Sequence, residues 1–184
     1  MDGIRIILFA AGSLGLGYVS RSVLLNTNAH GFYRFFAWEF ILAVVVINLD
    51  QWFVDPFSWR QLSSWACLII GIFMVIQGLL GLRQLGKPSQ HREDDTLLSL
   101  EKTTQLVTSG IYHWIRHPMY SSLLFLAWGA CLKQITWQSL ALTAAATVFL
   151  TATACVEERE NAAFFGSAYA VYQQQTRMFI PFIL

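Results

Sequence analysis

Charged residues are scarce in this sequence. Aspartate, glutamate, lysine and arginine make up 12% of the 184 residues, about half of the roughly 25% that is usual in soluble domains. Cysteine is also rare: Cys67, Cys131 and Cys155 all lie in apolar runs and none has C-x-x-C spacing. This argues against a disulfide framework and against a zinc site, and predicts that the three cysteines are buried small hydrophobic side chains. What the chain has in abundance is apolar side chains, at 55%.

The apolar residues are gathered into five runs. They cover residues 3–25, 35–49, 62–82, 119–132 and 137–156. A span of the bilayer's hydrocarbon core needs about 20 apolar residues, so the fourth run is short. The turn at 133–136 makes the last two runs a helical hairpin, and the first run is too long for a signal peptide and lacks its cleavage pattern. We therefore predict an all-α integral membrane protein with about five transmembrane helices.

Lysine and arginine are distributed unequally between the two sides of such a bundle. Nine of the twelve fall on the side of the first loop, the segment after the third span and the C-terminal tail: Arg21, Arg34, Arg83, Lys87, Arg92, Lys102, Arg116, Arg159 and Arg177. The positive-inside rule places that side in the cytoplasm. We expect a three-helix scaffold at 1–83 and a catalytic region at 84–184, made of a cytoplasmic segment, the hairpin 118–156 and an amphipathic C-terminal tail.

A polar stretch, "GIYHWIRHPMY" at 110–120, precedes the fourth span. Pro118 has no N–H and suits a first helical turn, so the helix should begin at about His117 or Pro118. His113 and His117 would then flank the helix start and not share a face, which argues against a metal pair. A helix N-terminus beside Arg116 would bind anions; alternatively, Arg116 reaches lipid headgroups and the aromatic residues form a membrane belt.

Acidic residues gather at the end of the fifth span, in "CVEERENAAFFGSAYAVY" at 155–172. One interpretation is a helix that has left the membrane and is solvated there. The apolar and aromatic residues that follow favour an amphipathic surface helix instead, in which Glu157 or Glu158 could face inward.

Three other patterns carry less information. "GSLGLG" at 12–17 indicates close helix packing through small residues and not a nucleotide loop, because no strand precedes it. "HREDD" at 91–95 is typical of an exposed loop. Glu39, inside the second span, should have a partner, and Arg34 lies close in sequence.

Two stretches together, "TQLVTSGIYHWIRHPMY" at 104–120 and "EERENAAFFGSAYAVY" at 157–172, resemble the isoprenylcysteine carboxyl methyltransferase superfamily, which includes phospholipid N-methyltransferases. The shared pattern is L-V-x-x-G-x-Y, then R-H-P-x-Y, then, after a helical hairpin, E-E, F-G-x-x-Y-x-x-Y and a closing proline, here Pro181. Order and spacing match through the C-terminal region, and the two halves would bracket the hairpin on one side of the membrane.

The resemblance implies a membrane enzyme that transfers a methyl group from S-adenosylmethionine to a lipophilic small molecule or lipid-modified acceptor. It implies a site facing the cytoplasm, in a bacterial inner membrane or the endoplasmic reticulum, with membrane lipids as partners and neither nucleic acid nor metal. Arg116 would orient the acceptor and Glu158 would take a proton. The cofactor contacts would be Thr104, Gln105, Leu106, Val107, Tyr112, His117, Pro118, Met119, Tyr120 and Glu157.

Two positions depart from the isoprenylcysteine enzymes. Thr104 stands where they have a histidine, and Thr153 stands where they have an arginine that would orient the substrate carboxylate. The acceptor therefore stays open among a carboxylate, a thiol, an amine and a phospholipid headgroup. Alternatives are a phospholipid N-methyltransferase-like or thiol methyltransferase activity, a nicotinamide enzyme similar to membrane sterol reductases, and a membrane protein without enzymatic activity.

Overall fold

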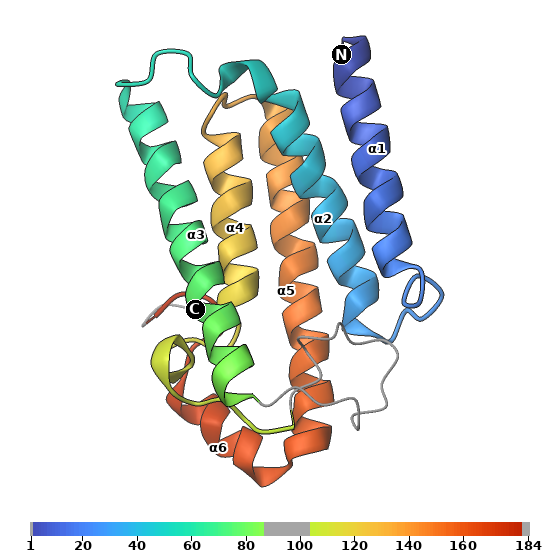
Figure 1. Cartoon of the computed structure of the whole chain (residues 1–184), viewed down its shortest axis with the longest axis vertical. Coiled ribbons are helices and arrows are strands. Elements are labelled where there is room, and N and C mark those ends of the chain that lie inside the picture. The colour runs from blue at the N-terminus through green and yellow to red at the C-terminus, as the bar shows by residue number, and fades with distance from the viewer. Residues whose placement is uncertain (1, 87–103, 182–184) are drawn as a thin grey trace.

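The computed structural model describes residues 2–86 and 104–181. Five helices run side by side in alternating directions, and a short sixth helix crosses one end of the bundle (Figure 1). The elements are α1 (Gly3–Ser20), α2 (His30–Ile47), η1 (Leu49–Gln51), α3 (Trp59–Leu85), η2 (Gly110–His113), α4 (Pro118–Cys131), α5 (Trp137–Phe165) and α6 (Ser167–Gln175). The all-α membrane fold predicted from the sequence is confirmed. The "HREDD" stretch and the basic residues at 87, 92 and 102 lie outside the described residues.

Helix lengths decide which elements can cross a membrane. Within the described residues, four helices are long and apolar enough: α1, α2, α3 and α5. The 14 residues of α4 rise only about 21 Å, less than the ~30 Å hydrocarbon core. Helices form at all five predicted apolar runs, but four of them, and not the predicted five, have the length of a span; the shortness of the fourth apolar run indicated this.

Two helices are longer than the membrane requires. α3 has 27 residues and α5 has 29, which corresponds to about 40 and 43 Å. α5 ends only at Gly166, whose φ of 61° turns the chain into α6. The predicted run stopped at 156, so the last turns of α5 carry Glu157, Glu158 and Glu160 beyond the apolar part of the helix.

The polar segments meet at one end of the bundle, as the alternation of the helices predicts. The start of α4, the end of α5 and α6 lie together there, close to the α1–α2 loop (Figure 1). His30, at the start of α2, uses its backbone N–H and its Nδ1 to contact the Glu160 carboxylate at 3.1 and 2.6 Å. The cytoplasmic orientation of this end stays a prediction. The division into a scaffold and a catalytic region also stays a prediction; helices of the two regions pack directly on each other, α2 on α5 and α3 on α4.

A buried lysine holds the opposite end together. Lys133, in the α4–α5 turn, is fully buried, and its Nζ lies 3.6 Å from the centroid of the Trp65 ring and 5.2 Å from that of Trp52. The ammonium group also donates to Gln61 Oε1 at 3.0 Å. An ammonium ion over aromatic faces is stabilised by the ring quadrupole, so this cage fastens the α4–α5 turn to the segments around α3.

α1 lies at the edge of the bundle beside α2 (Figure 1). Glu39 has a partner, as expected for an acidic residue inside a span, but it is not the nearby Arg34. The Ser13 hydroxyl of α1 donates to Glu39 Oε2 at 2.5 Å. The close packing predicted for "GSLGLG" occurs only at Gly12, where an added Cβ would lie 2.6 Å from Leu42 Cδ2. At Gly15 and Gly17 no atom lies within 4 Å of such a Cβ.

Candidate functional site

A cavity of about 90 Å³ opens at the polar end of the bundle. Residues from α3, from the segment before α4, from the first turn of α4, from α5 and from α6 form its walls. They are Leu82, Gln105, Leu106, Val107, Tyr112, Arg116, His117, Pro118, Met119, Tyr120, Glu157, Asn161, Phe165, Tyr169 and Tyr172. The cavity thus joins the two stretches that carry the sequence resemblance, which are separated in the chain by the α4–α5 hairpin.

Most of the residues proposed from the sequence line this cavity. Of the ten cofactor candidates, all except Thr104 are in its walls. Of the two catalytic candidates, Arg116 lines the cavity and Glu158 does not. These positions bring the candidates together, and the roles assigned to them stay predictions.

The fourth helix begins where its sequence requires. His117 has φ −123° and ψ 61°, and Pro118 is the first residue of α4, as predicted from the missing N–H of proline. The backbone before it is paired with the tail: Arg116 N–H donates to the Arg177 carbonyl at 2.8 Å, and His117 N–H to that of Met178 at 3.1 Å. This pairing fixes the two side chains in the wall of the cavity.

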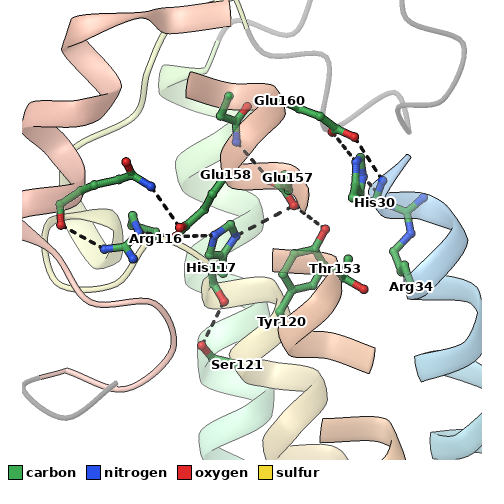
Figure 2. A network of polar contacts seen from close by, with 12 residues as sticks. His30, Arg34, Arg116, His117, Tyr120, Ser121, Thr153, Glu157, Glu158 and Glu160 are labelled. Atoms are coloured by element: carbon green, nitrogen blue, oxygen red, sulfur yellow. Dashed lines mark hydrogen bonds and ion pairs between the residues drawn. The ribbon is translucent and has the colours of Figure 1, made fainter. Parts of the chain in front are cut away.

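His117 lies between two carboxylates. The residue is 5% exposed, and its ring stacks on that of Tyr120 with the ring centroids 5.4 Å apart. Nδ1 lies 3.9 Å from Glu157 Oε2, and Nε2 lies 3.3 Å from Glu158 Oε1 (Figure 2). The Tyr120 hydroxyl donates to Glu157 Oε2. One carboxylate oxygen of Glu157 is thereby oriented by a phenol, and the imidazole lies within hydrogen-bond distance of Glu158 and within ion-pair distance of Glu157.

Arg116 and Glu158 form a largely buried ion pair. Nε donates to Glu158 Oε1 at 2.6 Å, and the two side chains are 11% and 13% exposed. Arg116 also donates to the Thr176 carbonyl at 2.6 Å, and Gln173 Nε2 donates to Glu158 Oε2 at 3.0 Å. The pair therefore ties α5 to the end of α6 and the tail (Figure 2).

Three tyrosines complete the wall. The Tyr172 hydroxyl donates to the Tyr112 carbonyl at 2.7 Å, and the Tyr112 hydroxyl donates to the Gly78 carbonyl of α3 at 3.3 Å. Burial raises the pKa of Tyr112, Tyr169 and Tyr172, and the Glu157 carboxylate adds to the rise for Tyr112. These phenols are therefore neutral at physiological pH, and those of Tyr112 and Tyr172 act as hydrogen-bond donors.

Five wall residues were not among the candidates from sequence reasoning: Leu82, Asn161, Phe165, Tyr169 and Tyr172. Asn161 and Phe165 follow Glu157 by four and eight residues, so a continuous helix places all three on one face. Asn161 Nδ2 lies 3.5 Å from Glu157 Oε1. Helical spacing beyond residue 156 would have identified both. Tyr169 and Tyr172 stand in the F-G-x-x-Y-x-x-Y motif, whereas Leu82 is brought in by packing alone.

The histidine pair that the sequence raised lies in two different elements. His113 belongs to η2 and His117 caps α4. In the described ranges 2–86 and 104–181, no group of three histidine, cysteine, aspartate or glutamate residues is placed to hold a metal ion.

Comparison with known proteins points to methyltransferases. The family model described as phospholipid methyltransferase matches residues 59–168. The chain is 37% identical over 90 residues to protein-S-isoprenylcysteine O-methyltransferase of Tribolium castaneum, covering 47% of this chain and 32% of that protein. It is 26% identical over 152 residues to methanethiol S-methyltransferase of Crocosphaera subtropica, covering 81% and 55%.

A third relative is matched over most of its length. The chain is 30% identical over 151 residues to a probable protein-S-isoprenylcysteine O-methyltransferase of Oryza sativa subsp. indica, covering 79% of this chain and 77% of that protein. No solved structure matches the chain significantly.

Proposed function

The chain belongs to the superfamily of isoprenylcysteine carboxyl methyltransferases and phospholipid methyltransferases, and from this premise we propose that it is an integral-membrane methyltransferase that uses S-adenosylmethionine. The observation that carries the proposal is the cavity in which His117, Tyr120 and Glu157 converge from α4 and α5. The acceptor is a lipophilic molecule that reaches this cavity from the membrane. A nicotinamide-dependent reductase is not favoured, because the matched family and the relatives reported above are methyltransferases by name.

The donor groups of the cavity suit this cofactor. Bound S-adenosylmethionine supplies a methyl group on a positively charged sulfur and presents an amino group, a carboxylate and an adenine ring. Glu157 offers negative charge to the cationic part, and His117 with the N-terminus of α4 offers donors to the carboxylate. Leu82, Leu106 and Val107 give an apolar wall for the base.

The size of the cavity adds a condition. At about 90 Å³ it is smaller than the ~300–1,000 Å³ typical of ligand pockets. A nucleoside-sized ligand therefore requires the side chains that line it to move apart. Methyl transfer asks the protein mainly to align the nucleophile with the methyl group and to keep water away, and the three buried tyrosines serve the second task.

The remaining candidate roles follow the sequence reasoning. Gln105, Pro118 and Met119 would contact the cofactor from the segment before α4 and from its first turn. Thr104 would act from just outside the cavity wall. The sequence suggested Arg116 for acceptor orientation and Glu158 for proton transfer, but the two side chains bind each other. In our proposal this ion pair fixes the C-terminal tail over the cavity, and its two side chains reach the acceptor only when the ion pair separates.

A thiol acceptor is the second candidate. Thr153, which stands where the isoprenylcysteine enzymes have an arginine, is fully buried, and its hydroxyl donates to the Phe149 carbonyl at 2.7 Å. It therefore offers no cation and no free donor to an acceptor carboxylate. A thiol needs no such partner, and methanethiol S-methyltransferase is among the relatives.

Calorimetry with S-adenosylmethionine and its demethylated product, in detergent and in lipid nanodiscs, tests the proposal. We expect binding by the wild type and its loss in Glu157→Gln and His117→Ala, both of which should still fold. Arg159→Gln is the matched control, because Arg159 is exposed on the same turns of α5. Absence of binding by the wild type in both environments would refute the proposal.

We further propose that the site faces the cytoplasm, in a bacterial inner membrane or the endoplasmic reticulum, on the strength of the basic residues at this end. Two exposed positions mark the ends of the bundle: Gln134 in the α4–α5 turn and Ser167 at the start of α6. A membrane-impermeant thiol reagent should label Gln134→Cys only from the side opposite the cytoplasm, and Ser167→Cys only from the cytoplasmic side. Intact cells or sealed vesicles of known orientation allow the two sides to be tested separately. The reverse pattern contradicts this orientation.

A further inference from the structure

Two glycines near the end of α3 lie against the wall of the candidate cavity. They are Gly78 and Gly81, which are about one helical turn apart. α3 packs on α4 and, near its own end, on η2 (Figure 1). We predicted this helix as part of a scaffold, but at these two positions it meets side chains that line the cavity.

Gly81 leaves room for the ring of Tyr112. A Cβ atom at position 81 would lie 3.0 Å from Tyr112 Cε2 and 3.1 Å from Tyr112 Cδ2. Both distances are shorter than the ~3.5–4.0 Å at which carbon atoms attract each other most strongly. Tyr112 is 6% exposed and lines the cavity. Any larger side chain at position 81 therefore has to displace this ring from α3.

Gly78 leaves room for the first turn of α4. A Cβ atom at position 78 would lie 3.2 Å from Met119 Cγ and 3.3 Å from Pro118 Cγ, and both of these residues belong to the cavity wall. The Gly78 carbonyl also accepts the hydrogen bond from the Tyr112 hydroxyl at 3.3 Å. The close approach at this glycine therefore brings α4 and the phenol directly onto the backbone of α3.

The surroundings of Tyr112 decide where its ring moves when it is displaced. Its carbonyl accepts a hydrogen bond from the Tyr172 hydroxyl of α6 at 2.7 Å, so its backbone is held between α3 and α6. Because Tyr112 lines the cavity, a ring that is pushed away from α3 moves into that space. The movement that relieves crowding at position 81 therefore narrows a cavity of about 90 Å³, which has to widen to take a nucleoside.

We propose that Gly78 and Gly81 are positioning residues for the cofactor. They act through the wall residues that rest on them, whose distance from α3 sets the width of the cavity. This inference rests on the proposed function and adds α3 to the elements that determine cofactor affinity. In the free protein, a side chain at position 81 is accommodated when Tyr112 moves into the cavity, whereas a bound cofactor forces the ring back against α3. Added volume on this face of α3 therefore weakens cofactor binding more than folding.

One added methyl group tests the assignment. Gly81→Ala should raise the Kd for S-adenosylmethionine at least about fivefold, measured by calorimetry in nanodiscs, while the melting temperature changes little. Gly129→Ala is the matched control, because its Cβ would lie 2.9 Å from Leu68 Cδ2 in the same α3–α4 interface but away from the cavity wall. The control should lower the melting temperature and leave the Kd unchanged. Equal effects of the two variants on the Kd, or an unchanged Kd in Gly81→Ala, would overturn the assignment.

A second readout needs neither cofactor nor activity. A fluorinated tyrosine incorporated at position 112 reports the surroundings of the ring by fluorine NMR. Its resonance should shift in Gly81→Ala and keep the wild-type position in Gly129→Ala, because only the first variant displaces the ring. An unshifted resonance in Gly81→Ala would refute the assignment. A shifted resonance together with no S-adenosylmethionine binding by the wild type would instead count against the proposed function alone.

Discussion

Removal of one hydroxyl group is the most informative perturbation of the candidate site. Tyr120→Phe keeps the ring that stacks on His117 with centroids 5.4 Å apart and deletes only the donor to Glu157 Oε2. A hydrogen bond to a charged group contributes about 1.5–3 kcal/mol. The Glu157 side chain is 22% exposed, so water can replace part of the lost donor, and we take the lower end of that range.

The expected loss is therefore about 1.5 kcal/mol, a rise of about tenfold in the Kd for S-adenosylmethionine. The physical reason is that Glu157 loses the group that orients its carboxylate toward the cavity. Isothermal titration calorimetry measures the change, and Tyr33→Phe in α2 is the matched control outside the site. A thermal unfolding scan in the same detergent should show both variants folded.

A double-mutant cycle separates orientation from a general disturbance of the pocket. If Tyr120 acts through Glu157, Tyr120→Phe adds little to the loss caused by Glu157→Gln, because the two residues form one unit. Losses that add in full would refute this reasoning, as would an unchanged Kd in Tyr120→Phe alone.

Three further predictions concern the supports of the site and the bundle. Arg116→Gln should lower the unfolding free energy by about 2–3 kcal/mol, because it leaves Glu158 largely buried without its cation. The double variant Arg116→Gln, Glu158→Gln should lose less unfolding free energy than the sum of the two single variants. Denaturant unfolding measures all three. Lys133→Met keeps the stem but removes the charge over Trp65; it should lower the unfolding free energy by about 1–2 kcal/mol, seen as a lower melting temperature, while cofactor affinity stays unchanged. Burial raises the pKa of Tyr172, so its contribution to stability is complete below the unfolded pKa of about 10 and is lost as pH rises above it; Tyr172→Phe should flatten the alkaline limb of a stability-against-pH curve, and an unchanged limb would contradict this.

The helices show how far local sequence rules reach. Pro118 placed the start of α4 correctly, because a missing N–H and a fixed φ act within one residue and its neighbours. The apolar run of the fifth span ends nine residues before α5 does, because the end of an apolar run marks the membrane boundary and not the end of the helix. Backbone hydrogen bonds continue past that boundary until Gly166 ends them with a positive φ.

The candidate site shows the same division. Glu157 and His117 could be proposed from their motifs, but nothing local indicates that a phenol from α4 meets Glu157 or that Arg116 is engaged by Glu158. Ion pairs between residues 42 positions apart depend on how α4 and α5 pack. The sequence likewise suggested Arg34 as the partner of Glu39, whereas the packing of α1 on α2 supplies Ser13.

By itself, the sequence determined the all-α membrane class, the alternation of helices and the two segments that meet at one end, because hydrophobic run length and proline chemistry are local quantities. Only the tertiary structure decided which carboxylate faces the cavity and which is held in an ion pair. These are properties of distances between helices, and such distances follow from the packing of many side chains at once.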